Sequence, residues 1–327
     1  MKKSAFLNFC FLLGFVSLLC GGLLVGCARP SLDEYGCFQT LDAAITASKK
    51  SGHNIVVIAT MEGDDAQSSD FMDSVVRADD FSAVKADYSL VLMDFSRKSF
   101  DATQTSEDAD KTAVKAAAEK ERIMQENALS AKLLNVSLTP SFYLLTKEGC
   151  FVSELDFIDD INSPADFIKL IESQSEKLER VNALIQNTRT GSSQERLLAV
   201  NELYDSTDPV YRPFLTDFIE KGIKLAGQDA ALKSKFLIAL TDARSTKDFL
   251  SGNTAEAVQG YVKLADNKKL TPQYRQQAWY MAGYLLAMSD SSQYDLIIQY
   301  FQKAIQAAPE SNDAVSIQRA LNEITGN

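Results

Sequence analysis

The chain has 327 residues, a formal net charge of −11 and one histidine. Its length is sufficient for two domains, and its composition is that of a globular protein without a low-complexity tract. The acidic balance and the lack of a long Lys/Arg run argue against nucleic-acid binding through phosphates.

The N-terminus has the pattern of a signal segment that is cleaved off, after which the residue that becomes N-terminal is lipidated. A pair of lysines precedes an apolar run over residues 5–24, which approaches the length of a membrane-spanning helix. The run ends in Leu-Val-Gly-Cys at Cys27, which resembles a bacterial lipobox. The resemblance implies that residues 1–26 are a signal peptide, that Cys27 is lipidated, and that residues 27–34 form a tether. The acyl chains would anchor the protein in the bacterial envelope, facing the periplasm, and either membrane remains open.

Residues 35–190 alternate between helical and strand patterns. The predicted elements are a helix over 38–51, a strand over 54–60, a helix over 68–76, a strand over 88–95, a helix over 105–134, strands over 141–146 and 150–155, and a helix from residue 165. Strands joined through helices pair in parallel, and the last two strands form a hairpin. The sequence therefore predicts an α/β fold with a mixed sheet and a terminal β-hairpin.

This order of elements resembles the thioredoxin fold of bacterial periplasmic proteins. The strand over 88–95 ends near an acid, Asp94, as in that family, and residues 135–141 loosely match the family's segment before the hairpin. The resemblance implies a cis peptide bond before Pro140, facing the active site. It also places the two cysteines of the family's Cys-x-x-Cys motif at Asp65 and Ser68.

Asp65 and Ser68 cannot perform the chemistry of that motif. Dithiol exchange needs a reactive thiolate and a second thiol that resolves the mixed disulfide. We therefore expect a redox-inactive site, with Asp65 as an ordinary cap of the following helix. A sharper alternative is that the Asp65 carboxylate mimics the thiolate in a peptide-binding groove beside Pro140.

The other candidate chemistries are also weak. Cys37 and Cys150 remain after loss of the leader, and the fold places them at opposite ends of the sheet, so we expect small apolar core residues rather than a disulfide. His53 alone cannot form a multi-histidine metal cluster. No calcium-loop spacing and no phosphate-binding loop occurs. We predict no catalytic residue, no metal and no cofactor.

Residues 191–327 carry helical patterns only. The predicted helices cover 194–205, 208–226, 230–250, 254–266, 272–288, 293–308 and 312–324. Antiparallel helical hairpins joined by short turns are typical of a solenoid. The sequence therefore predicts an all-α second domain.

One hairpin of this region resembles a tetratricopeptide repeat. Trp279 and Gly283 match the first helix of that repeat, and Phe301, Ala304 and Pro309 match the second helix and its end. The resemblance implies that these residues form the core of the hairpin, and that such repeats bind peptides or proteins.

Together these features predict a non-enzymatic, lipid-anchored envelope protein that binds a protein or peptide partner as an adaptor or chaperone-like factor. Two alternatives remain open. The first is an unconventional thiol–disulfide oxidoreductase that uses Cys37 or Cys150. The second is a small-ligand-binding protein.

Overall fold

The computed structural model describes residues 32–106, 109–156, 161–290 and 292–326. The predicted signal peptide, the predicted lipidation site Cys27 and most of the predicted tether lie outside the described residues. Within the described part, no helix is both long and apolar enough to cross a membrane.

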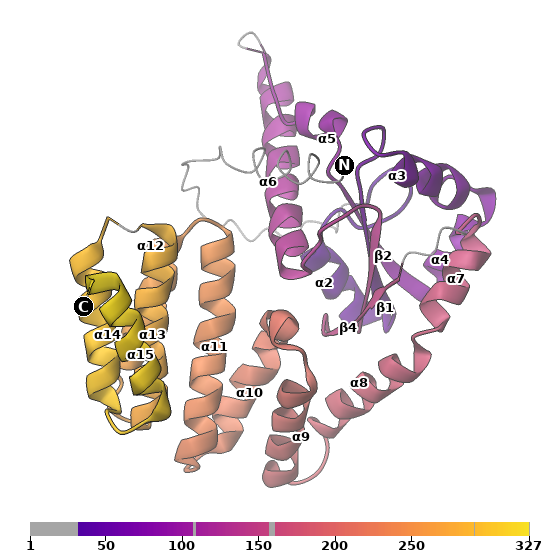
Figure 1. Cartoon of the computed structure of the whole chain (residues 1–327). Helices are drawn as coiled ribbons and strands as arrows, with labels where there is room; N and C mark the ends of the chain where they lie inside the picture. Colours follow the sequence, from indigo (N-terminus) through magenta and orange to yellow (C-terminus); the bar gives the residue numbers. More distant parts are fainter. Residues whose placement is uncertain (1–31, 107–108, 157–160, 291, 327) are drawn as a thin grey trace.

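The N-terminal part is a mixed α/β unit built on a four-stranded sheet with the order β2-β1-β3-β4 (Figure 1). Strand β1 (Asn54–Thr60) pairs in parallel with β2 (Tyr88–Asp94) and antiparallel with β3 (Ser141–Leu145). Strand β4 (Phe151–Leu155) completes the predicted hairpin at the edge. The inner strands β1 and β3 are buried along almost their whole length, which explains their continuous apolar sequence.

Helices cover both faces of this sheet. They are α2 (Leu41–Ser51), α3 (Ala66–Phe71), α4 (Ser82–Asp87), α5 (Arg97–Asp101), α6 (Lys111–Leu133), α7 (Pro164–Glu172) and α8 (Ser175–Asn187). Alternate residues of a strand point to opposite faces. Val56 and Phe142 therefore join a core with α3, α4 and α7, whereas Val57 and Tyr143 join a second core with α2.

The C-terminal part is entirely helical. Its elements are α9 (Ser193–Ser206), the 3₁₀ helix η3 (Pro209–Leu215), α10 (Thr216–Ala226), α11 (Ala230–Leu250), α12 (Thr254–Ala265), α13 (Pro272–Ser289), α14 (Tyr294–Ala307) and α15 (Asn312–Thr325). Consecutive helices pack against each other, and α11 to α15 stand side by side as an array (Figure 1).

The two parts share a hydrophobic core. Cys150 and Ile185 of the α/β part belong to one cluster with Leu197, Leu215 and other residues of the helical part. The rings of Phe151 and Tyr211 stack with centroids 3.4 Å apart. The predicted boundary at residue 190 lies in an exposed turn between α8 and α9, and the core is continuous across it.

Four predicted helices differ from the structure. The helix predicted over 38–51 is wrong in its first three residues, because Thr40 is the N-cap of α2 and Phe38 forms a bridge with Val91 of β2. The helix predicted over 105–134 is wrong in its first turns, because α6 begins at Lys111 with Asp110 as its N-cap. The helix predicted over 208–226 is interrupted, since Pro213 lies in the 3₁₀ helix η3 that precedes α10. The helix predicted over 68–76 is divided in the structure. Helix α3 begins at Ala66 and ends at Phe71, and a π-helical turn, η1 (Met72–Val76), follows it.

Candidate functional site

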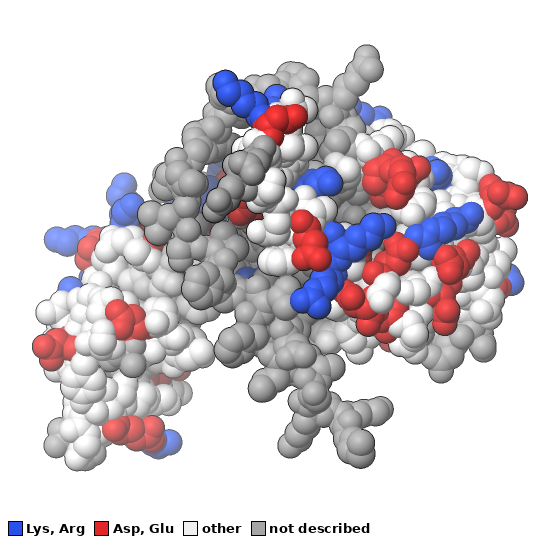
Figure 2. All heavy atoms as spheres, turned by 90° about the horizontal axis from the view of Figure 1, so that it is seen from above, with Lys and Arg blue, Asp and Glu red and all other residues white. Residues whose placement is uncertain are grey.

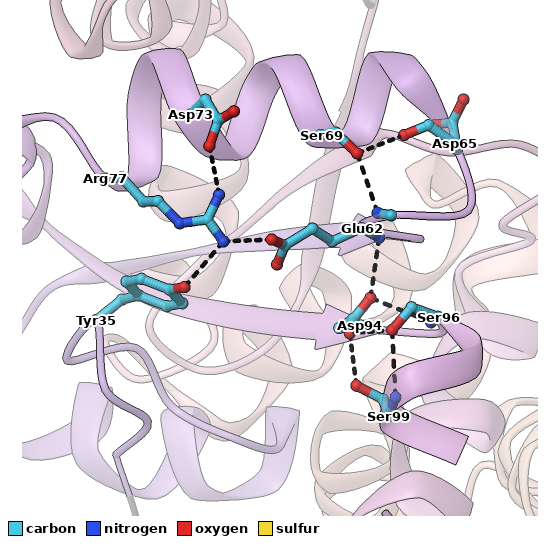
Figure 3. A network of polar contacts seen from close by, with 10 residues as sticks. Tyr35, Glu62, Asp65, Ser69, Asp73, Arg77, Asp94, Ser96 and Ser99 are labelled. Carbon is cyan, nitrogen blue, oxygen red and sulfur yellow. Dashed lines mark hydrogen bonds and ion pairs between the residues drawn. The ribbon is translucent and has the colours of Figure 1, made fainter. Parts of the chain in front are cut away.

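The carboxyl ends of β1 and β2 meet at one edge of the sheet, where the sequence predicts the degenerate redox site. The loop over residues 61–65 follows β1 there and leads into α3, while α5 begins just after β2. Figure 3 shows that polar side chains from these segments converge at this edge.

Asp65 and Ser68 contact each other directly. Asp65 is the N-cap of α3, and its Oδ2 accepts hydrogen bonds from the Ser68 backbone N–H at 3.0 Å and from the Ser68 hydroxyl at 2.7 Å. Ser68 is fully buried, and its Oγ accepts from the backbone N–H of Met61 at 3.1 Å. The expectation that Asp65 caps the helix is confirmed, and the pair also fixes the start of the loop.

The loop over residues 61–65 has no free backbone donor. Its N–H groups donate to the Ser68 hydroxyl, the Asp94 carboxylate, the Ser69 hydroxyl and, twice, the carbonyl of Met61. A groove that binds an extended peptide, or an oxyanion hole, needs donors that point outward. This loop satisfies its donors within the protein instead.

Asp94 is the centre of the network (Figure 3). Its Oδ1 accepts from the backbone N–H groups of Glu62 and Ser96, and its Oδ2 accepts from the hydroxyls of Ser96 and Ser99. These four bonds fill the usual acceptor positions of a carboxylate. Asp94 therefore links the end of β2 to the loop and to the start of α5. All four of its usual acceptor positions are occupied by these bonds, so none is left to accept a hydrogen bond from a substrate.

Arg77 closes the other side of the network. Its guanidinium donates to Asp73 at 2.6 Å, to Glu62, and to the Tyr35 hydroxyl at 3.1 Å. These contacts are partly exposed to solvent, and such ion pairs contribute at most about 1 kcal/mol each to stability. They connect the N-terminal segment, the loop and the end of η1.

The peptide bond between Thr139 and Pro140 is cis. Pro140 is buried and directly precedes β3, where Ser141 lies opposite Ala59 near the end of β1. The loop that contains Pro140 is therefore at the same edge of the sheet as Asp65 and Ser68. Leu138 of this loop is exposed to solvent.

The two thiols are not poised for chemistry. Cys37 is 0% and Cys150 is 1% exposed, and both are free in the structure. Burial raises the pKa of the Cys37 thiol, and likewise the pKa of the Cys150 thiol, to about 12. The two lie in separate cores, since Cys37 packs against α3 and α4 and Cys150 packs with the helical part.

In the helical part, Trp279 and Gly283 hold α13 against α14. The Trp279 ring stacks on Tyr300 with centroids 5.6 Å apart. A Cβ added at Gly283 would lie 2.6 Å from the ring of Phe301. The missing side chain therefore lets the Phe301 ring approach the α13 backbone.

Ala304 and Pro309 complete the hairpin from α14. Ala304 is fully buried in the same core, whereas Pro309 is exposed and follows the end of α14. All five residues that carry the repeat-like pattern thus lie in or beside one hairpin.

The structure also reveals a buried polar cluster that sequence analysis missed. Asp242 of α11 accepts a hydrogen bond from the Tyr261 hydroxyl of α12 at 2.7 Å. Burial raises the pKa of Asp242 to about 6, against the opposing effects of Tyr261 and of Arg212. The Arg212 guanidinium lies 4.4 Å from the ring centre of Tyr204. No local pattern predicts this cluster, because its members come from α9, η3, α11 and α12.

A small cavity of about 330 Å³ lies between α8 and the turns that flank β1 and the hairpin. It is lined by Gly52, Asn54, Lys147, Glu148, Asn182, Ile185, Gln186 and Arg189. Arg189 donates to one oxygen of Glu148 at 2.7 Å, while the other oxygen of Glu148 is buried without a partner in the described part. Among the described residues, no cluster of three or more His, Cys, Asp or Glu could hold a metal ion.

Charge is not segregated on the face seen from above (Figure 2). Basic and acidic side chains are interspersed over the α/β part, and the helical array at the left shows separate acidic and basic patches among uncharged residues. The described residues visible on this face therefore form no extended basic surface for a polyanion.

Comparison with known proteins yields one partial match. Residues 232–327, from the first turn of α11 onward, match a family described as an uncharacterised protein C-terminal domain. No curated protein and no solved structure matches the chain.

Proposed function

We propose that the chain is a non-enzymatic, lipid-anchored protein of the bacterial envelope that mediates protein–protein interaction as an adaptor or chaperone-like factor. The observation that carries this proposal is the closed hydrogen-bond network at the edge of the sheet. There, Asp65 and Ser68 bond to each other, Asp94 is saturated, and the loop has no free N–H group. The described polar groups at this edge bond to one another, which favours a structural role for them.

A thioredoxin-like identity for residues 35–190 is part of the proposal. Its support is the strand order β2-β1-β3-β4, the parallel β1–β2 pair, the terminal hairpin, and the cis bond at Pro140 beside the start of α3. In this interpretation Asp65 and Ser68 occupy the places of the two cysteines, and the fold is kept for recognition rather than for redox chemistry.

A repeat-like identity for residues 191–327 is the second part. Its support is the series of consecutively packed helices and the close contact of Gly283 with Phe301 inside the α13–α14 hairpin. Helical arrays of this kind expose broad surfaces that bind peptides and proteins. The helical part is therefore the proposed binding module, and the α/β part supports it through the shared core.

Anchoring through Cys27 is the third part, and the lipobox-like sequence supports it. Metabolic labelling with a radioactive fatty acid tests it. The wild-type chain should incorporate label and sediment with envelope membranes, whereas the Cys27→Ser variant should do neither. Equal labelling of the two chains would contradict the anchor.

Of the two alternatives, thiol chemistry has the weaker support, because both thiols are buried and have raised pKa values. Binding of a small polar ligand has one observation in its favour, which is the cavity with the unpartnered Glu148 oxygen. Native mass spectrometry of freshly purified protein tests this second candidate, since a bound ligand would add a discrete mass.

The interaction itself is tested by affinity capture from envelope extract. The bait is the full chain from residue 27 with Cys27→Ser, because the shared core argues against a fragment that begins after α8. A partner that is retained specifically and binds the purified bait directly would support the proposal. Absence of any specific partner would contradict it.

A further inference from the structure

Several large apolar side chains among the described residues are exposed to solvent. Three of these side chains lie at one end of the helical array. Tyr284 and Met288 are 42% and 63% exposed, and Tyr294 is 43% exposed. Tyr284 and Met288 lie one turn apart on the same face of α13, and Tyr294 is the first residue of α14. We call the surface formed by these three residues the hairpin-tip surface.

The two tyrosines of this surface have contacts that hold their side chains. The Tyr284 ring stacks on Tyr280, with centroids 6.1 Å apart and planes 24° from parallel. The Tyr294 hydroxyl donates to the carbonyl of Ile324, in the last turn of α15. An ordered aromatic side chain loses little conformational entropy on binding, and Tyr and Met are enriched in protein interfaces.

The surroundings of the hairpin-tip surface are acidic. Asp290 and Asp295 are the only charged residues between Arg275 and Lys303 in the sequence. Glu323 is exposed in the last turn of α15, whose end lies at Tyr294. The carboxyl ends of α13 and α15 lie beside this surface and add partial negative charge, while the amino end of α14 adds partial positive charge.

The bases on either side of Asp290 and Asp295 in the sequence have other contacts. Arg275 donates to the carbonyl of Ala265, and the Lys303 ammonium lies 4.4 Å from the ring centre of Trp279. Arg319 is one turn before Glu323 on α15, and it is the base closest in sequence to that carboxylate. The α13–α14 turn and the last two turns of α15 therefore carry three acids and one base.

We propose that the hairpin-tip surface is the docking site for a basic protein segment that carries apolar side chains. Apolar side chains of such a segment would cover Met288 and the tyrosine rings. Its Lys or Arg side chains would lie over the ring faces and pair with Asp290, Asp295 and Glu323. This inference rests on the proposed interaction function and names the surface and the chemistry of the partner.

Three synthetic peptides of equal length test the charge and apolar requirements separately. The first combines lysine with leucine and phenylalanine, the second replaces lysine by glutamate, and the third replaces the apolar residues by serine. Binding to the full chain with Cys27→Ser is measured by fluorescence anisotropy. The first peptide should bind about tenfold or more tightly than the other two, and added salt should weaken it. Equal or tighter binding of the glutamate peptide would overturn the proposal.

Variants then locate the site. The double variant Tyr284→Ser/Met288→Ser should weaken binding of the lysine peptide about tenfold or more, and Asp295→Asn/Glu323→Gln should reduce its salt dependence. The matched control is Leu198→Ser/Val315→Ser, which removes two apolar side chains of similar exposure from α9 and from the opposite end of α15. An unchanged affinity of the first variant, or an equal loss in the control, would overturn the proposal.

Capture from envelope extract separates this inference from the function on which it rests. If the wild-type bait and the Tyr284→Ser/Met288→Ser bait retain the same partner equally, the interaction function stands and the hairpin-tip surface is the wrong site. If neither bait retains a partner, the proposed function fails, and this inference fails with it.

Discussion

Among single residues, Asp242 has the environment with the clearest thermodynamic consequence. Its carboxyl is largely buried between α11 and α12, and the Tyr261 hydroxyl is its hydrogen-bond donor within the described part. Burial disfavours the ionised form, so the pKa rises to about 6 from the usual 3.8. The native state therefore holds a proton more tightly than the unfolded chain does.

We expect this carboxyl to lower the free energy of unfolding as pH rises from about 4 to about 6. In that window the native state binds more protons than the unfolded state, and the loss is complete above the native pKa. The Asp242→Asn variant keeps an acceptor for Tyr261 without the charge. Its stability relative to wild type should increase between pH 4 and pH 7 by up to about 3 kcal/mol. Urea unfolding at the two pH values measures this.

The exposed Asp295→Asn substitution is the control, and its stability relative to wild type should not change in the same way. An Asp242→Asn variant whose difference from wild type is the same at both pH values would show that the carboxyl is solvated in the native state.

The candidate site was only partly predictable at the residue scale. The sequence supplied Asp65 as a cap, and the resemblance supplied Asp94 as the acid at the end of a strand. Neither of them predicted the contacts that close the site, because these contacts join residues far apart in the chain. Arg77 reaches Tyr35, and Asp94 reaches the backbone of Glu62. Such contacts require the sheet register, which local patterns do not give.

Among the elements, the α13–α14 hairpin depends most on one small residue. Gly283 has no side chain where the Phe301 ring approaches, and an added Cβ would lie 2.6 Å from one ring atom and 2.7 Å from another. The ring also stacks on Tyr280, with centroids 5.5 Å apart. The ring is confined on two sides and cannot give way at low cost.

The Gly283→Ala variant should therefore lose about 1–3 kcal/mol of stability by overpacking, even though alanine favours a helix over glycine. The second-site variant Phe301→Leu removes the opposing ring atoms. In a double-mutant cycle, Gly283→Ala should cost less in the Phe301→Leu background than in wild type. Thermal or urea unfolding of the four chains measures the coupling, and strict additivity would contradict the contact.

Element boundaries show where sequence patterns fail. Helices with apolar periodicity and clear ends, such as α11 and α13, agree with prediction to within a residue. The start of α6 does not, because Thr105, Ser106 and Asp110 are all good N-caps and local sequence cannot choose among them. Helix α5 has five residues and is too short to show a period. Pro213 was a visible signal for the interruption before α10.

For the whole molecule, the shared core is the decisive feature. Cys150, which precedes β4, shares one cluster with residues of α8 and of the helical part, and Lys49 of α2 pairs with Asp217 of α10 at 3.3 Å. The exposed ion pair contributes little. The buried apolar contacts contribute more, since each buried side chain stabilises by roughly 1.5–3 kcal/mol. We therefore expect the α/β and helical parts to unfold together.

Two probes in one chain test this cooperativity. Trp279 is the only tryptophan, and its fluorescence reports on the helical array. In a chain that begins at residue 27 and carries Cys27→Ser/Cys150→Ala, Cys37 is the single thiol, and its labelling reports on the α/β part. The two urea transitions should coincide. Midpoints that are clearly separated would show that the parts are independent domains joined by a weak interface.

The central claim is that this scaffold has the geometry of a dithiol site without the chemistry, and the insulin-reduction assay tests it most directly. The wild-type chain should show no turnover above the background of the reductant. The Asp65→Cys/Ser68→Cys variant should form an intramolecular disulfide, because the two side chains already touch, and should gain measurable turnover. Wild-type turnover that Cys37→Ser or Cys150→Ser abolishes would contradict the claim.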